Sequence, residues 1–214
     1  MLKLLKPLYC CVRHVDLLLM KKYDFFKTVI DRCLALIMLV VLSPVLLVAV
    51  LAIRVESKGP VFFTQIRLGR NCSVFHILKF RTMTIDKDRA ETQTFFDSPG
   101  ITRVGSVLRR WKIDELPQLF NVLRGDMSLV GPRPALPQML DEIDQLSRQR
   151  FSVRPGLTGW AQVNGNIALP WPIRWKYDVE YVKSRSFLLD CRIISRTVLV
   201  ILFGDDYLQR RNKQ

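Results

Sequence analysis

The chain has 214 residues, which is enough for one domain or for one domain with an anchor. Hydrophobic residues make up 49% and charged residues 24%, a composition that excludes a disordered tail and a polytopic membrane protein. The 33 Lys and Arg outnumber the 19 Asp and Glu, which gives a formal net charge of +14. So basic a chain favours a polyanionic partner: a nucleic acid, an anionic membrane surface or a phosphorylated substrate.

The cysteine and histidine content excludes several kinds of site. The five cysteines are odd in number and form no CxxC pair, so the sequence predicts neither a disulfide framework nor a zinc site. There is no HExxH motif and no P-loop, and two histidines alone cannot build a metal site. A reducing, cytosol-facing location fits this content best.

Residues 33–53 form an uncharged run of 21 residues, long enough to span a bilayer as a straight helix of about 1.5 Å per residue. Ser43 and Pro44 stand at its centre, with nine apolar residues on each side. Proline lacks a backbone N–H and clashes with the preceding helical turn, so a kink is predicted there. Each apolar arm then reaches only about 13–14 Å, less than half of the roughly 30 Å hydrocarbon core.

Basic residues flank this run on both sides, and the positive-inside rule places both flanks in the cytoplasm. We therefore predict a re-entrant membrane anchor over residues 23–56, broken at Ser43-Pro44. A kinked single span is the alternative. Residues 1–22 are expected to form an N-terminal surface segment, and residues 57–214 a cytosolic catalytic domain. The flanking cations are Lys21, Lys22, Lys27, Arg32, Arg54 and Lys58.

The pattern after the anchor predicts an α+β domain that is mainly helical. Residues 61–66 and 74–80 have the composition of two strands joined at a Gly69-Arg70-Asn71 turn, a small β-hairpin. Residues 86–100 are polar and predict a loop, with a short helix as the alternative. Apolar residues recur at helical spacing over 104–111 and again over 136–143, which predicts two amphipathic helices.

The basic side of the first amphipathic helix suits lipid headgroups or phosphates, and a merely solvated face is the alternative. The apolar segment 187–203 is interrupted by charges, which favours an interfacial or core helix over a membrane span.

Two adjacent carboxylates mark the start of the next predicted helix. Leu116, Leu119 and Leu123 repeat at helical spacing, and Gly125 is placed to end the helix. Asp114 then falls near the N-cap and Glu115 in the first turn, where the helix dipole favours ionised carboxylates. The structural interpretation is a cap and a dipole-complementing residue; the functional one is a site for a divalent metal and phosphate groups.

Four motifs resemble the bacterial sugar transferase family, the monotopic polyprenyl-phosphate phosphoglycosyl transferases, in their minimal catalytic form. The similarity runs from about Tyr23 to Phe203 and keeps the motifs in order. The family's re-entrant helix is broken at Ser-Pro, which Ser43-Pro44 matches. The motifs are KFRTM at 79–83, DELPQLFNVL at 114–123, GDMSLVGPRP at 125–134 and RPGLTGWAQVNG at 154–165.

The resemblance implies transfer of a sugar-1-phosphate from a UDP-sugar to a polyprenyl phosphate such as undecaprenyl phosphate, with release of UMP. This is a first membrane step of glycoconjugate or polysaccharide assembly. It implies that Asp114 is the nucleophile of a ping-pong reaction through a phosphosugar-aspartyl intermediate, and that Glu115 completes the catalytic pair. Both carboxylates are candidate ligands of Mg²⁺, with Mn²⁺ as the alternative ion.

The resemblance also implies a set of phosphate- and substrate-binding residues. A guanidinium group can contact two phosphate oxygens at once, which suits the arginines in this set. Arg154 has a turn-supporting role as its alternative, and Gln162 and Asn164 either bind the sugar or uridine or fix the 159–165 loop. The implied residues are Lys79, Arg81, Arg109, Arg133, Arg154, Gln162 and Asn164.

The expected location is the cytosolic face of the bacterial inner membrane. The expected partners are the UDP-sugar, the polyprenyl phosphate, membrane lipid and downstream glycosyltransferases. A membrane-anchored nucleic-acid binder is a second hypothesis, but the basic residues alternate with carboxylates and apolar faces and form no recognition motif, so no nucleic-acid partner is expected. A non-catalytic scaffold is a third, and the intact Asp114-Glu115 pair argues against it.

Overall fold

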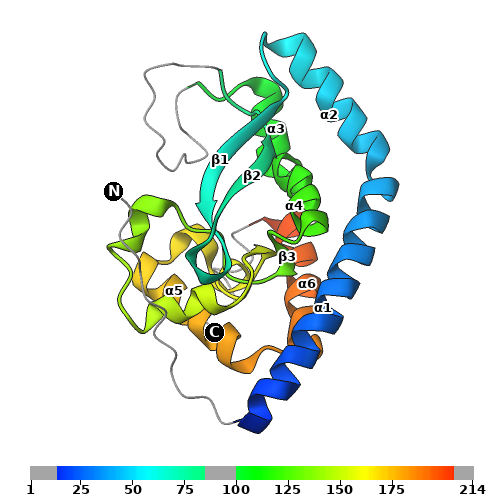
Figure 1. Cartoon of the computed structure of the whole chain (residues 1–214). Helices are drawn as coiled ribbons and strands as arrows, with labels where there is room; N and C mark the ends of the chain where they lie inside the picture. Colours follow the sequence, from blue (N-terminus) through cyan, green and yellow to red (C-terminus); the bar gives the residue numbers. More distant parts are fainter. Residues whose placement is uncertain (1–13, 85–99, 205–214) are drawn as a thin grey trace.

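The computed structural model describes residues 14–84 and 100–204, with side chains from residue 22 onward. The described chain is mainly helical with two small two-stranded sheets, which confirms the predicted mainly helical α+β class (Figure 1). The predicted loop over 86–100 and most of the predicted surface segment over 1–22 lie outside the described residues.

The two long N-terminal helices run along one edge of the molecule (Figure 1). Helix α1 covers His14–Val41 and α2 covers Ser43–Glu56, and the two are bent by 62°. Ser43 Oγ donates to the Val40 carbonyl at 2.7 Å, so the side chain takes up a backbone acceptor at the break. The kink predicted at Ser43-Pro44 is confirmed, but α1 begins well before the uncharged run and is not a short apolar arm.

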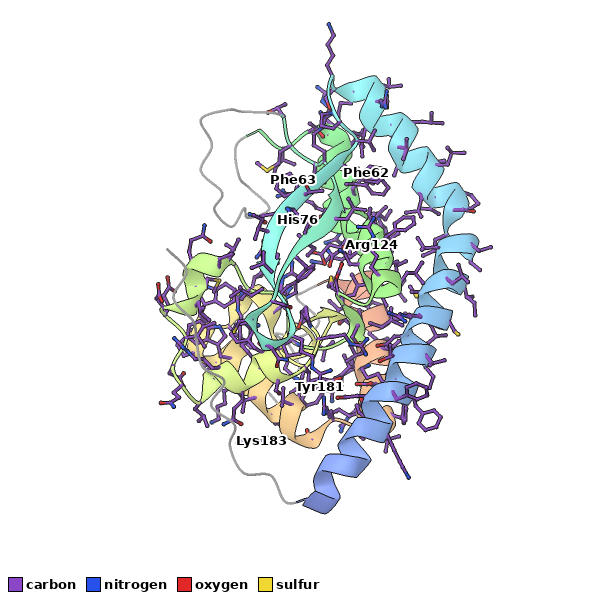
Figure 2. The ribbon with its side chains drawn as sticks, viewed as in Figure 1. Phe62, Phe63, His76, Arg124, Tyr181 and Lys183 are labelled. Atoms are coloured by element: carbon purple, nitrogen blue, oxygen red, sulfur yellow. The ribbon has the colours of Figure 1, made fainter. Side chains whose placement is uncertain are left out.

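Among the described residues, no single helix has both the length and the apolar composition of a membrane span, whereas the bent pair of 22–41 and 43–56 reaches both when its halves are taken together. The side chains on the outer side of this pair point away from the rest of the molecule (Figure 2). Many of them are large and apolar, and Val55 is 89% exposed. The re-entrant topology stays a prediction. The exposed set includes Phe25, Phe26, Leu36, Ile37, Val40, Val41, Leu47, Val48 and Leu51.

The predicted hairpin is confirmed. Strand β1 (Phe62–Leu68) pairs antiparallel with β2 (Val74–Phe80), and Phe63 lies opposite Lys79 while Arg67 lies opposite Phe75. Asn71 in the turn has a φ of 54°, the left-handed conformation that asparagine tolerates better than most residues.

A second sheet was not predicted. Strand β3 (Ser128–Val130) pairs parallel with β4 (Gly156–Thr158). The two segments approach so closely that a Cβ on Gly156 would overlap the backbone of Gly131. Glycine is needed here because backbone atoms, which cannot move aside as a side chain would, fill the space.

The remaining helices are α3 (Arg103–Arg110), α4 (Leu119–Arg124), α5 (Trp171–Ser184) and α6 (Phe187–Phe203). Helices α3 and α6 confirm two of the sequence expectations. Short 3₁₀ segments make up much of the rest: Arg70–Cys72, Ile113–Gln118, Pro137–Leu140, Ser147–Ser152, Gln162–Asn164 and Asn166–Ala168.

The amphipathic helix predicted over 136–143 is wrong, because only the turn Pro137–Leu140 forms there. Leu136, Met139 and Ile143 are buried together, so the apolar spacing is satisfied by packing in a hydrophobic cluster with Trp175 rather than by helix. The Asp144 carboxylate accepts from the Ser147 N–H at 2.9 Å, a local bond that competes with helical continuation.

The main hydrophobic cluster joins α1 to the hairpin, α4 and β3. Ala35 on α1 and Leu119 on α4 are fully buried in it. A smaller cluster packs Ala49 and Ile53 of α2 against Leu108 of α3. The inner side of both long helices is therefore part of the folded body.

A buried polar network also holds α1 in place. Lys27 on α1 lies 2.7 Å from the carboxylate of Asp190 on α6 and 3.4 Å from that of Asp31. Ser128 of β3 donates to Asp31, and Tyr181 of α5 donates to Asp190 at 2.8 Å. Buried ions need partners of this kind, so the network fixes how α1 sits against α5, α6 and β3.

Candidate active site

The segment that carries the two adjacent carboxylates is not one continuous helix. A 3₁₀ turn over Ile113–Gln118 precedes α4, and Lys112 before it has a left-handed φ of 56°. Pro117 lacks an N–H and so cannot donate the bond that an α-helix would require there. Gly125 ends α4 with a φ of 92°, as the sequence predicts. Asp114 and Glu115 both lie in the first turn of the 3₁₀ segment.

Glu115 is held between two cations from distant parts of the chain. Its Oε1 accepts from Lys79 Nζ of β2 at 2.7 Å and from Arg133 Nη2, after β3, at 2.7 Å. The Glu115 side chain is only 14% exposed. Burial alone would raise the pKa of Glu115, but Arg133 and Lys79 outweigh it and hold the pKa well below its usual range. Glu115 is therefore ionised and fixed at neutral pH.

Asp114 has a different environment. Burial, and then the negative charge of Glu115, raise the pKa of Asp114 to about 6, against the opposing charges of Lys79, Arg109 and Lys112. This differs from the sequence expectation that the helix start would favour the ionised form, because desolvation outweighs it. Among the described residues, none hydrogen-bonds to the Asp114 carboxylate. The pair thus consists of Glu115, which is held by two cations, and Asp114, which is ionised at neutral pH and accepts no hydrogen bond from the described side chains.

Three of the candidate cations converge on this pair. Lys79 and Arg133 bind Glu115 directly, and Arg109 of α3 acts on Asp114 through its charge. The Arg109 Nε donates to Thr82 Oγ1 at 2.8 Å, which orients the guanidinium.

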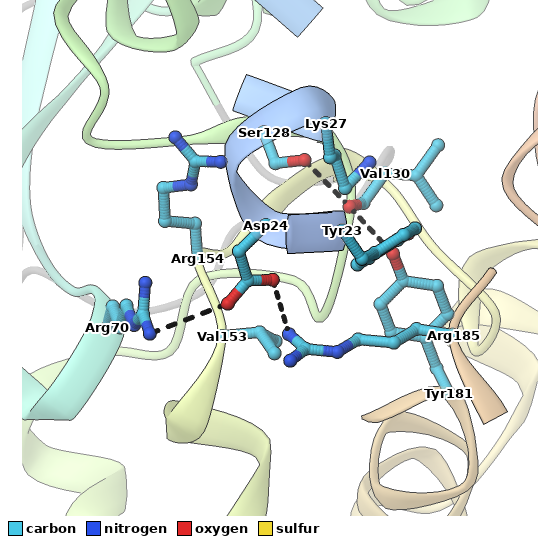
Figure 3. A pocket seen from close by; sticks show the side chains of 10 residues that line it. All are labelled: Tyr23, Asp24, Lys27, Arg70, Ser128, Val130, Val153, Arg154, Tyr181 and Arg185. Carbon is cyan, nitrogen blue, oxygen red and sulfur yellow. Dashed lines mark hydrogen bonds and ion pairs between the residues drawn. The ribbon is translucent and has the colours of Figure 1, made fainter. Parts of the chain in front are cut away.

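Arg81 and Arg154 make other contacts. The buried Arg81 donates to the carbonyls of Ser57 and Lys58 at 2.8 Å each, where it secures the chain after α2. Arg154 donates to Thr28 of α1 at 2.6 Å and lines a small cavity with Asp24 and Arg185 (Figure 3). Among the described residues, neither Arg81 nor Arg154 contacts Asp114 or Glu115, and the substrate-binding roles of these two arginines stay predictions.

Gln162 and Asn164 belong to the loop before α5. Asn164 donates to the Trp160 carbonyl at 2.7 Å and accepts from Arg196 of α6 at 3.3 Å. These bonds correspond to the loop-fixing alternative. The amide group of Gln162 is buried next to Gly159 and has no hydrogen-bond partner in the described parts of the chain. A substrate role for either residue stays a prediction.

The sequence reasoning did not single out Gln65 and Arg67. Arg67 Nη2 donates to Gln65 Oε1 at 2.6 Å, and the Arg67 charge acts on Glu115 and Arg133. The strand register places both residues on the face that carries Lys79. Phe63, Gln65 and Arg67 are every second residue of β1 and so share one face, and Phe63 lies opposite Lys79.

Buried contacts set the backbone position of Arg133. Arg150 Nη2 donates to the Arg133 carbonyl at 2.6 Å and lies 2.8 Å from Asp178 of α5. On the other side, Gly131 is locked against Gly156 by the β3–β4 pairing. These contacts fix the backbone from which the Arg133 side chain reaches Glu115.

Among the described residues, the carboxylate pair could supply two ligands of a magnesium site and would need further ligands to complete it. In the described parts of the chain, no group of three or more His, Cys, Asp or Glu side chains gathers as metal ligands would. Mg²⁺ in phosphoryl-transfer sites is commonly held by one or two carboxylates together with substrate phosphates and water. Asp114, with no hydrogen-bond donor among the described residues, fits this pattern, and Glu115 offers a second carboxylate beside it.

Comparison with known proteins shows which family the chain resembles. The family described as "Bacterial sugar transferase" matches residues 22–204. The uncharacterized sugar transferase EpsL of Bacillus subtilis is 40% identical over 183 residues, which cover 86% of this chain and 90% of EpsL. The UDP-glucose:undecaprenyl-phosphate glucose-1-phosphate transferase of Caulobacter vibrioides is 41% identical, over 86% of this chain and 72% of its own.

A third relative is longer. The UDP-N-acetylgalactosamine-undecaprenyl-phosphate N-acetylgalactosaminephosphotransferase of Aeromonas hydrophila is 41% identical over 85% of this chain, but the match covers 45% of that protein. The chain thus spans most of some relatives and less than half of others. The matched range 22–204 covers most of α1, all of α2 and the segment that contains Asp114 and Glu115. The chain belongs to the bacterial sugar transferase family.

Proposed function

We propose that the protein transfers a sugar-1-phosphate from a UDP-sugar to undecaprenyl phosphate and releases UMP, as an early membrane step of polysaccharide assembly. The names of the Caulobacter and Aeromonas relatives support these two substrates. Those relatives use glucose and N-acetylgalactosamine, respectively, so family membership does not determine the sugar. Downstream glycosyltransferases would extend the lipid-linked product.

The observation that carries the proposal is the contrast between the two carboxylates. Glu115 is clamped by Lys79 and Arg133, while Asp114 has no hydrogen-bond donor among the described residues and a pKa of about 6. An ionised, unengaged carboxylate surrounded by cations is suited to attack a phosphorus atom. The cations outnumber the carboxylates, and this excess suits a bound diphosphate.

In the proposed first step, an Asp114 oxygen bonds to the sugar-bearing phosphorus. The bond from that phosphorus to the bridging oxygen breaks, and UMP leaves with the electron pair. In the second step, an oxygen of undecaprenyl phosphate attacks the same phosphorus and the Asp114 carboxylate is regenerated. A Mg²⁺ ion held by Asp114, Glu115 and the substrate would neutralise charge on the diphosphate. The clamped Glu115 keeps Lys79 and Arg133 in position for the phosphate oxygens.

We further propose that α1 and α2 form the re-entrant anchor and place the site at the cytosolic face of the inner membrane. The outer side of the bent pair supports this, since Val40, Val41 and Val48 are each about two-thirds exposed. Apolar exposure of this extent is typical of a surface that is covered by lipid or protein. Basic residues lie on both sides of the uncharged run 33–53, within α1 before it and from Arg54 after it, as the positive-inside rule predicts for a segment that returns to the cytosol.

Incubation with a panel of UDP-sugars, without any lipid acceptor, tests the reaction. The two-step route predicts release of about one equivalent of UMP or less and an acyl-phosphate adduct on the peptide that contains Asp114. Asp114→Asn should abolish both, whereas Asp141→Asn, a change at an exposed carboxylate far along the chain, should change neither. An adduct on Glu115, or UMP release only after undecaprenyl phosphate is added, would contradict the mechanism.

A further inference from the structure

One face of the hairpin carries more of the site than Lys79 alone. Residues directly opposite each other on paired strands, and residues two apart on one strand, share a face of the sheet. Phe63 lies opposite Lys79, Gln65 opposite Ile77, and Arg67 opposite Phe75. The face that directs Lys79 to Glu115 therefore also directs Gln65 and Arg67 to the same side.

Arg67 is fixed on that face. Its Nη2 donates to the buried Gln65 at 2.6 Å, and its Nη1 donates to the Pro134 carbonyl at 3.4 Å, next to Arg133. Burial, and then the charge of Arg133, lower the pKa of Arg67 to about 10. Its Nε is buried and has no hydrogen-bond partner among the residues that the structure describes.

The buried position of Arg67 costs free energy in the folded protein when no ligand is bound. Among the described residues, no carboxylate forms an ion pair with Arg67, and its neighbour Arg133 is a like charge. Burying a guanidinium without a carboxylate partner of its own costs free energy unless an anion joins it. An oxyanion between Arg67 and Arg133 would supply that partner.

The strand register indicates which anion this is. Lys79, which binds Glu115, lies opposite Phe63, whereas Arg67 stands four residues further along β1, about 13 Å away at roughly 3.3 Å per residue. Arg67 therefore lies further along the hairpin than Lys79, beside Arg133 and Pro134. In phosphoryl transfer the leaving group departs opposite the nucleophile, roughly in line with it.

We infer that Arg67, held by Gln65, binds with Arg133 the nucleoside-side phosphate of the sugar nucleotide, the group that leaves as the nucleoside monophosphate. This inference rests on the proposed function. The pair Gln65–Arg67 is a leaving-group site, distinct from the Asp114 end where the sugar phosphate is transferred.

The test measures binding of UMP, with Mg²⁺, to the full-length protein in detergent by calorimetry. Arg67→Gln should weaken UMP binding about tenfold or more, the effect of losing one charge-assisted contact. Arg67→Lys should recover part of the affinity. Gln65→Glu separates binding from folding, because the new carboxylate still accepts the hydrogen bond from Arg67 but neutralises the charge of the guanidinium. This variant should bind UMP more weakly and have a melting temperature at or above that of the wild type.

Arg70→Gln is the matched control, since Arg70 stands at the tip of the same hairpin, is half exposed and pairs with Asp24. It should leave UMP affinity unchanged. Unchanged UMP affinity in both Arg67→Gln and Gln65→Glu would overturn the inference, as would a defect confined to the undecaprenyl phosphate step. A wild-type protein that releases no UMP from any UDP-sugar would instead refute the proposed function, so the two failures are distinguishable.

Discussion

Removing the guanidinium of Arg150 should destabilise the protein strongly, because it leaves the Asp178 carboxylate buried without its cation. The two side chains are 2% and 3% exposed, and Arg150 Nη2 lies 2.8 Å from Asp178 Oδ2. Breaking such a pair from one side costs about 3–5 kcal/mol. For a chain of this size that corresponds to a fall in melting temperature of roughly 10 °C. We expect this for Arg150→Met, measured by thermal unfolding at pH 7.

The loss should be smaller at lower pH. Burial already raises the pKa of Asp178 to about 6 against the opposing charge of Arg150. Without Arg150 the pKa rises further, and an acid whose folded pKa is raised gains stability as pH falls towards its unfolded value near 3.8. The Arg150→Met variant should therefore regain part of its melting temperature between pH 7 and pH 5, relative to the wild type at the same pH.

The double variant Arg150→Met with Asp178→Leu separates folding from positioning. Within residues 14–84 and 100–204, Arg150 Nη1 and Asp178 Oδ1 have no hydrogen-bond partner. The pair is thus incompletely satisfied, and a variant with apolar residues in its place should melt close to the wild type. The Arg133 carbonyl nevertheless loses its 2.6 Å donor, and single-turnover UMP release should fall about tenfold. A single variant as stable as the wild type, or a double variant with wild-type turnover, would refute this reasoning.

Three further predictions concern the site and the anchor. The rate of single-turnover UMP release should fall as the pH drops through about 6, where Asp114 takes up a proton. Glu115→Gln should move this fall in rate to lower pH, because it removes a negative charge that raises the pKa of Asp114. A fall in rate at the same pH in both proteins would contradict the assignment. Gly156→Ala should cost about 1–3 kcal/mol or more in a denaturant titration, because backbone atoms occupy the Cβ position, and wild-type stability would exclude the close approach of β3 and β4. Single cysteines at Lys22 and Lys58, in a cysteine-free background, should both resist a membrane-impermeant reagent applied to spheroplasts, and labelling of only one of them would exclude the re-entrant topology.

Several elements could be predicted from the sequence because the backbone properties of single residues determine them. Pro44 dictates a break because it has no N–H to donate, and Gly125 ends a helix because it tolerates a positive φ. The hairpin followed from two β-rich segments around a turn. In each case the information lies within a few residues, so no tertiary contact was needed to reach it.

The same local rules failed where packing had the larger effect. The spacing of Leu136, Met139 and Ile143 is helical, yet these residues meet in a cluster without a helix. The strands β3 and β4 have three residues each, too few to show a periodic pattern, and they form because two glycine-containing segments can approach closely. In both cases, packing between segments distant in the sequence determined the structure, and the local pattern did not.

The sequence by itself identified the residues of the candidate site: an Asp-Glu pair at the start of a short helical segment, with basic residues before and after it. Only the tertiary structure decided which of these residues contact one another. Lys79 and Arg133 stand 36 and 18 positions from Glu115, and they clamp it because β2 and the end of β3 meet there. The same folding turned Arg154 towards α1 and brought Arg67 to the site. Ion pairs between distant segments depend on where the chain returns in space, and that position is set by the burial of the whole core rather than by local sequence.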